Sequence, residues 1–96
     1  MNIIRVSAKT SPNVLARAIA DFMKDDGVIH LRAVGAAAIN QAVKAIAICR
    51  IIIVATGADI VCTPWFSEVT IEDERKTAIT FSVELRWPEI ELSKAA

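Results

Sequence analysis

The sequence predicts an α/β fold, namely an α+β two-layer sandwich of order β-α-β-α-β-β with both helices on one face of a mixed sheet. Three observations predict it. Apolar and polar residues alternate near both ends of the chain, two longer segments between them look helical and stop near glycines, and the connections are short. With 96 residues, 54% of them hydrophobic, we expect one domain over residues 1–87 and a short C-terminal tail over residues 88–96.

The first part of the chain predicts a strand and an amphipathic helix. From Ile3 to Lys9 the side chains alternate with the period of two that is typical of a half-buried strand. Ser11 is suited to cap a helix whose first residue is Pro12, and Gly27 is suited to end that helix. The apolar stripe expected to face the core consists of Val14, Leu15, Ala18, Ile19, Phe22 and Met23.

The middle of the chain predicts a second strand and a second helix. Alternation returns over residues 28–34, where the residues expected to face the core are Ile29, Leu31 and Ala33. Gly35 and the run Ala36–Ala38 lead into a helix that extends to about Ala55, and Gly57 ends the element. The alanine-rich start of this helix would allow close packing.

The last part of the chain predicts two strands joined by an acidic turn. Residues 58–66 are a nearly continuous apolar run, which indicates a strand covered on both faces. Residues 77–87 alternate, and those expected to face inward are Ile79, Phe81, Val83, Leu85 and Trp87. The turn between them has the acidic tip Glu72-Asp73-Glu74. Right-handed crossovers make the first two strands parallel, and the last two form an antiparallel hairpin.

Charge and hydropathy exclude several classes of protein. Eleven basic and eleven acidic residues cancel, but residues 1–50 hold seven basic and three acidic side chains while residues 51–96 hold four and eight. The apolar stretch over residues 33–62 is interrupted by charged residues that are costly in a bilayer, and the N-terminus has no signal-peptide pattern. We therefore expect a soluble, cytoplasmic protein without a membrane partner. Cys49 and Cys62 match no metal or redox spacing, and we interpret both as small buried apolar residues.

The residues do not predict catalysis. His30 is the single histidine and has no acid or nucleophile partner in the pattern. The tip at Glu72–Glu74 lacks the alternating oxygen-ligand spacing of a calcium loop, so we interpret it as a solvated hairpin tip. Walker, GxGxxG and HExxH motifs are absent from the sequence. We expect no enzyme activity, no metal and no cofactor.

A binding site is more plausible at the edge where the first two strands end and both helices begin. Open α/β sheets bind ligands at such an edge, and helix N-termini favour phosphates. The candidate residues there are Lys9, Ser11, Asn13, Gly35, Asn40, Gln41 and Lys44. Helix capping and tight packing explain Ser11 and the alanines equally well.

The sheet face turned away from the helices is a second candidate surface. It carries Arg5, Lys9, His30, Arg32 and Arg86, with Glu84 as its one acid. We expect no aromatic platform on it, which argues against stacking of bases. Scattered basic residues on such a face are often merely solvated, so a nucleic-acid contact there stays one alternative.

The segments VSAKTSPN (6–13), AVGAAAINQAVKAIAICR (33–50), GADIVCTPWF (57–66) and EDERKTAI (72–79) resemble the stage V sporulation protein S family. The resemblance covers roughly residues 3–86. It implies an Alba-like fold, dimers, nucleic-acid binding and a regulatory role linked to sporulation. It also implies a basic contact in the loop after the first strand, which Lys9 matches. The hairpin departs from the family pattern through its acidic tip, so only Arg75 and Lys76 are candidates in it.

The leading hypothesis is therefore an Alba-like homodimer, or a higher oligomer, that binds DNA or RNA at the strand-end edge. The alternative is a protein-interaction module without nucleic-acid binding, and a third interpretation is a small anionic ligand at the same residues. We expect the dimer interface at the end of the second helix and the strand at residues 58–66, because Ile48, Ile51 and Ile52 lie off the buried stripe of that helix.

Overall fold

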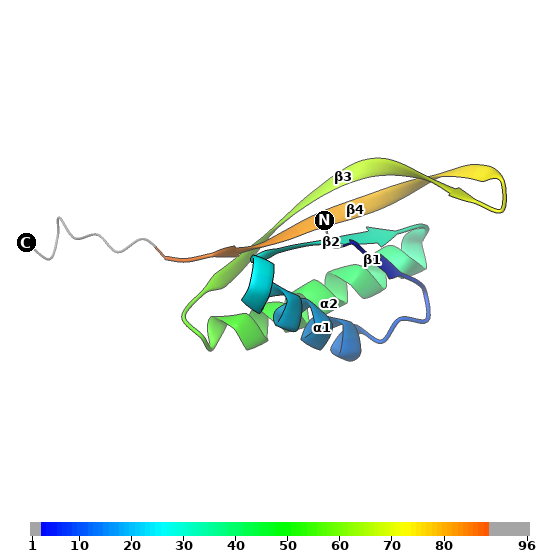
Figure 1. Ribbon diagram of the computed structural model, residues 1–96. Coiled ribbons are helices and arrows are strands. Elements are labelled where there is room, and N and C mark those ends of the chain that lie inside the picture. Colours follow the sequence, from blue (N-terminus) through cyan, green and yellow to red (C-terminus); the bar gives the residue numbers. More distant parts are fainter. Residues whose placement is uncertain (1–2, 89–96) are drawn as a thin grey trace, which may run out of the picture.

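The computed structural model describes residues 3–88, and its element order confirms the predicted β-α-β-α-β-β sandwich (Figure 1). The elements are β1 (Ile3–Val6), α1 (Pro12–Asp26), β2 (Val28–Ala33), α2 (Ala36–Val54), β3 (Asp59–Ile71) and β4 (Glu74–Arg86). The sheet has the order β1-β2-β4-β3, in which β1 and β2 are parallel and the other pairs are antiparallel. The predicted C-terminal tail, residues 88–96, lies outside the described residues except for Pro88.

Helix α1 begins and ends where the sequence predicts. The Val14 N–H donates to Ser11 Oγ over 3.3 Å, and Gly27 leaves the helix in the left-handed conformation with φ 75°. The buried stripe differs in part from the prediction, because Val14 and Phe22 are exposed. The residues that α1 buries are Leu15, Ala16, Ile19, Ala20 and Met23. The helix is thus turned so that two alanines face inward, which lets α2 approach closely.

Helix α2 packs on the sheet through small residues. Its buried residues are Ala38, Ala42, Ala45, Cys49 and Ile53. Ile39 and Ile46 pack at the border of the core, whereas Val43 is exposed. By length and composition α2 could cross a membrane, and 28% of its apolar window is buried within this fold.

The core lies between the sheet and the two helices, which cover the same face (Figure 1). The largest fully buried side chains are Ile19, Met23, Ile29, Leu31, Val83 and Cys49. Full burial of an aliphatic side chain contributes about 1.5–3 kcal/mol, so these residues account for much of the stability of a domain of this size.

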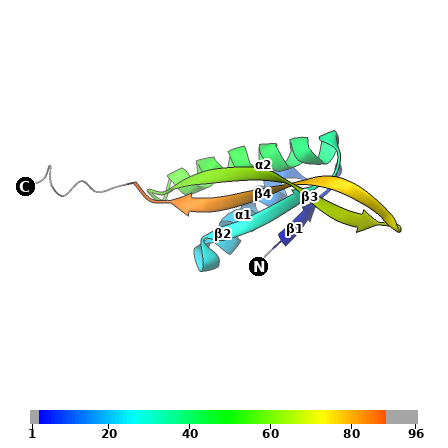
Figure 2. The ribbon, with the colours of Figure 1, turned by 90° about the horizontal axis from the view of Figure 1, so that it is seen from above.

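Strands β3 and β4 form a long hairpin whose distal half reaches past β1 and β2 as an arm (Figures 1 and 2). The prediction that residues 58–66 are covered on both faces is wrong. β3 is the edge strand, and beyond Ile60 the helices leave its inner side open, so that Phe66 is 77% exposed. The prediction that both cysteines are buried is confirmed for Cys49 and wrong for Cys62, which lies on this open strand.

The prediction of which β4 side chains face inward is confirmed in the middle of the strand. Phe81 and Val83 are buried beneath the helices, while Trp87 follows the strand and is exposed. Thr80 and Ser82 point to the opposite face, yet Thr80 is only 2% exposed, because neighbouring side chains cover it there. One of these is Ser67, whose hydroxyl lies 2.8 Å from that of Thr80.

Candidate functional site

The loop after β1 is a compact turn fastened to α2. Strand β1 ends at Val6, earlier than predicted, because Ser7 and Thr10 close a turn. The Ser7 N–H donates to Thr10 Oγ1 over 2.8 Å, and the Thr10 N–H donates to the Ser7 carbonyl over 3.1 Å. Gln41 Nε2 then donates to the Thr10 carbonyl over 3.0 Å, so the predicted site residue Gln41 positions the loop.

The structure brings the predicted edge residues to one end of the molecule. Lys9 lies beside the Thr10 carbonyl to which Gln41 bonds, and Asn40 and Lys44 are exposed one helical turn apart on the same helix. Ser11 caps α1 through its side chain, and Asn13 is exposed in the first turn of that helix. This end therefore presents two lysines and two amides to solvent.

Helix α2 begins at this edge without a side-chain cap. Gly35 occupies the N-cap position with φ 87°, a conformation that other residues rarely adopt. A Cβ at Gly35 would meet no atom within 4 Å, so the backbone there is open to solvent. The first N–H groups of α2, with the partial positive charge of a helix N-terminus, are free to meet an anion.

The basic residues of this end are not neutralised by acids. Among residues 3–88, Arg5, Lys9, Arg32 and Lys44 make no ion pair. The predicted site residue Arg75 differs from them, because it is paired with Glu68 within the hairpin arm. Lys76 lies 3.6 Å from Glu74, on the other face of the same arm.

A basic hollow of about 460 Å³ lies where the arm passes the ends of β1 and β2. Its charged lining is Arg5, Arg32 and Lys76, and we call it the arginine hollow. Its other lining residues are Val6, Ser7, Ala8, Val34, Val69, Thr70 and Ile71. Of the predicted site residues, only Arg32 lines it. Arg5 joins Arg32 because the two are register partners on the parallel strands β1 and β2.

Trp65 is a residue of this region that the sequence analysis missed. It pairs with Thr80, which pairs with Arg32, so all three share the outer face of the sheet. Its ring stands nearly perpendicular to that of His30, with centroids 5.5 Å apart. The expectation of no aromatic group on this face is therefore wrong. Side chains of a strand alternate between its two faces, and Ile60 faces the core. Trp65, five residues later, is therefore expected on the outer face.

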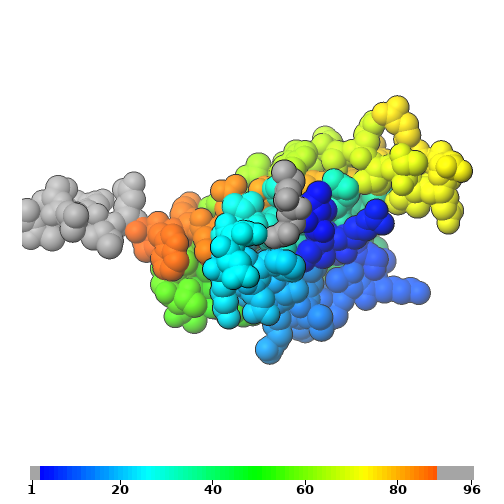
Figure 3. Space-filling view, in the orientation of Figure 1, coloured from blue at the N-terminus to red at the C-terminus, as the bar shows by residue number. Residues whose placement is uncertain are grey.

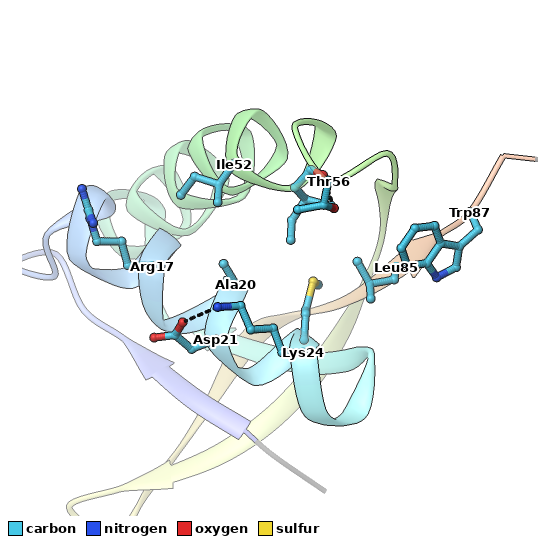
Figure 4. A pocket seen from close by; sticks show the side chains of 10 residues that line it. Arg17, Ala20, Asp21, Lys24, Ile52, Thr56, Leu85 and Trp87 are labelled. Atoms are coloured by element: carbon cyan, nitrogen blue, oxygen red, sulfur yellow. Dashed lines mark hydrogen bonds and ion pairs between the residues drawn. The ribbon is translucent and has the colours of Figure 1, made fainter.

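A second hollow, of about 540 Å³, lies at the opposite end between α1, the end of α2 and β4 (Figure 4). Ile52, Leu85 and Trp87 contribute apolar walls, while Asp21 and Lys24 form an ion pair at its rim over 3.7 Å. None of the predicted site residues lines this hollow, so it is separate from the strand-end edge.

The remaining strong interaction ties α2 to β3. Arg50 donates to both oxygens of Asp59, over 2.8 and 3.1 Å, and the Ile60 N–H donates to the same carboxylate. These bonds, with Arg86 nearby, lower the pKa of Asp59 to about 2. Burial raises the pKa of the Cys49 thiol to about 11. At neutral pH the buried thiol is therefore protonated and inert.

Comparison with known proteins agrees with this architecture. The solved structure of Alba from Thermoplasma volcanium is similar to this chain with a TM-score of 0.58 and 21% sequence identity, over 88% of this chain and 99% of that one. The likeness confirms the predicted Alba-like fold. The family model described as stage V sporulation protein S matches residues 2–86. The protein therefore belongs to the stage V sporulation protein S family, a family of small sporulation-related regulatory proteins.

Proposed function

We propose that this protein acts in the cytoplasm as a dimeric regulator that binds nucleic acid, without catalysis, through phosphate contacts at the strand-end edge. One observation carries the proposal. Arg5, Lys9, Arg32 and Lys44 make no ion pair among residues 3–88. Arg5, Arg32 and Lys44 lie on elements that end or begin at that edge, and Lys9 lies in the loop between β1 and α1. Cations without acidic partners are available to replace the counterions of a phosphate backbone.

The acidic residues of α1 lie at the end of the domain opposite the strand-end edge. Because the whole chain has no net charge, attraction to nucleic acid depends on local segregation. Three acids, Asp21, Asp25 and Asp26, occupy the last turns of α1, which lie at the far end of the domain from the α1 N-terminus. A phosphate backbone approaching the strand-end edge thus meets Lys9 and the arginines of the sheet, away from these three acids.

The acidic tip of the arm limits how nucleic acid approaches. Glu72 and Asp73 project beyond the body with the arm, which the space-filling view shows at the yellow end (Figure 3). A phosphate backbone would be repelled from this tip, so we propose that the contact lies at the strand-end edge and not at the tip itself.

The dimer in this proposal is supported by exposed apolar residues. At the end of α2, Ile51 is 75% exposed and Val54 is also exposed, and Phe66 projects from the open inner side of β3. Exposed apolar side chains on α2 and β3, two elements that contact each other, support a protein interface along them. The second candidate function, a protein-interaction module, would use this same apolar surface for a different partner.

Salt dependence separates the two candidate functions. We expect labelled DNA or RNA to bind the wild-type protein with an affinity that falls steeply between 50 and 200 mM salt, as phosphate contacts require. In the variant Lys9→Ala/Lys44→Ala, the slope of log affinity against log salt should fall by about one unit for each lost contact. The matched control is Arg17→Ala, which removes an exposed cation on α1 that makes no ion pair among the described residues.

The proposed site is wrong if the double variant, verified as folded, retains the wild-type affinity and slope. The proposed function is wrong if the wild-type protein binds neither DNA nor RNA at low salt.

A further inference from the structure

We propose that the outer face of the sheet binds single-stranded nucleic acid, with one base stacked on Trp65 and a neighbouring phosphate in the arginine hollow. The inference deepens the proposed function and rests on it, because it names the form of nucleic acid and the surface that selects it.

The first step is the alignment of the groups across the sheet. Arg5 pairs with Arg32, Arg32 with Thr80, and Thr80 with Trp65, so one row crosses all four strands on the outer face. Neighbouring strands are about 4.8 Å apart, which sets Trp65 roughly 14 Å from Arg5 along the row. A nucleic-acid strand could therefore place a base at one end of this row and a phosphate at the other within a few nucleotides.

The second step is the state of the aromatic group. Trp65 is 42% exposed, on a face that no helix covers. Its contact with His30 is edge-on, with an angle of 83° between the ring planes, so the two rings are not stacked on each other. The contact fixes the orientation of the indole, and a fixed, exposed aromatic ring is suited to stack against a base.

The third step is the chemistry of the arginine hollow. Arg5, Arg32 and Lys76 line it, and of these three cations only Lys76 has an acidic partner, Glu74, which is not itself a lining residue. Within residues 3–88, Arg32 Nε and His30 Nδ1 are buried without a hydrogen-bond partner. A buried donor without an acceptor is costly, and arginine commonly donates two parallel bonds to a phosphate. A phosphate in the hollow would therefore meet two arginines whose donors are not engaged by carboxylates.

The fourth step is the choice between one strand and two. In a duplex the flat faces of the bases are stacked on each other, and an aromatic side chain on a sheet does not reach them. In a single strand the faces are free, and stacking on an aromatic residue tolerates any sequence. The pairing of an exposed indole with a basic hollow therefore favours a single strand over a duplex and over an apolar protein partner.

The test compares binding of oligo(dT), oligo(rU) and duplex DNA by fluorescence anisotropy. Trp65→Ala should weaken single-strand binding by about 5- to 150-fold, the range for loss of one stacked base, without changing the salt slope. Arg32→Gln should lower that slope by about 0.7, the value for one phosphate of a single strand. Trp87→Ala, which removes the other exposed tryptophan from the opposite end, is the matched control and should bind like the wild type.

A second variant guards against loss of the fold. Trp65→Phe keeps an aromatic ring and should recover most of the single-strand affinity, whereas Trp65→Leu should not. In the Trp87→Phe background, the fluorescence of Trp65 alone should be quenched when a single strand binds.

The possible failures are distinguishable. A wild-type protein that binds no nucleic acid at low salt overturns the proposed function. A wild-type protein that binds, while Trp65→Ala keeps its affinity or loses duplex and single-strand affinity equally, overturns this inference alone. Unquenched Trp65 fluorescence in a saturated complex also overturns it.

Discussion

Replacing Ala45 with leucine tests whether α2 carries buried alanines because it packs too closely against the core for larger side chains. Ala45 is fully buried, as are Ala42 on the same helix and Ala16 on α1. Leucine adds three carbon atoms at a position without room for them, and such overpacking costs about 1–3 kcal/mol. In a domain of about 100 residues, each kcal/mol lowers the melting temperature by roughly 4–8 °C.

The measurement is thermal and urea unfolding followed by circular dichroism. The control is Ala37→Leu, an exposed position in the first turn of the same helix, where we expect little change. Equal melting temperatures and urea midpoints for the two variants would refute the idea that packing demands alanine. The alanines would then be explained by helix propensity alone.

Three further predictions follow from other parts of the structure. Because the pKa of Asp59 is lowered to about 2 from its usual 3.8, the stability that its ion pair provides is present above pH 3.8 and is lost as the pH falls toward 2. Urea midpoints across this range should therefore fall less steeply for Asp59→Asn than for the wild type. The variant Ile51→Glu should dissociate the proposed dimer in sedimentation at micromolar concentration, whereas Val14→Glu, at a comparably exposed apolar position, should not. An unchanged assembly with Ile51→Glu would exclude this part of α2 from the interface. In the folded protein a thiol reagent should modify the exposed Cys62 well before the buried Cys49, and equal rates would contradict the packing of α2.

The helix boundaries and the strand order along the chain could be predicted because their signals are local. The Ser11 cap, the left-handed Gly27 and the alternation in β4 depend on a few neighbouring residues. Which faces of each strand are buried depends on tertiary packing, so this burial could not be predicted from local signals. The apolar run from Ala58 to Phe66 indicated burial, but β3 became the sheet edge, and half of it lies in the arm.

The candidate site could likewise be predicted only in the parts that depend on local signals and strand pairing. The parallel pairing of β1 and β2 was expected, and with its register it sets Arg5 beside Arg32. The presence of Lys76 in the same hollow depends on the path of the arm across the sheet, which no local pattern encodes. Trp65 was missed because a strand interpreted as buried on both faces has no exposed side on which to place it.

Pro64 has a consequence for how two copies of the chain can meet. It lies in the middle of β3, whose second edge has no neighbouring strand among residues 3–88. A proline within a paired strand is tolerated where its nitrogen points away from the partner strand, so Pro64 removes an N–H donor from the open edge. A strand from another molecule would find the hydrogen-bond ladder interrupted there, which hinders fibre-like growth by sheet extension. For the dimer proposed above, Pro64 thus favours contact through side-chain packing, which gives a closed pair, over extension of the sheet.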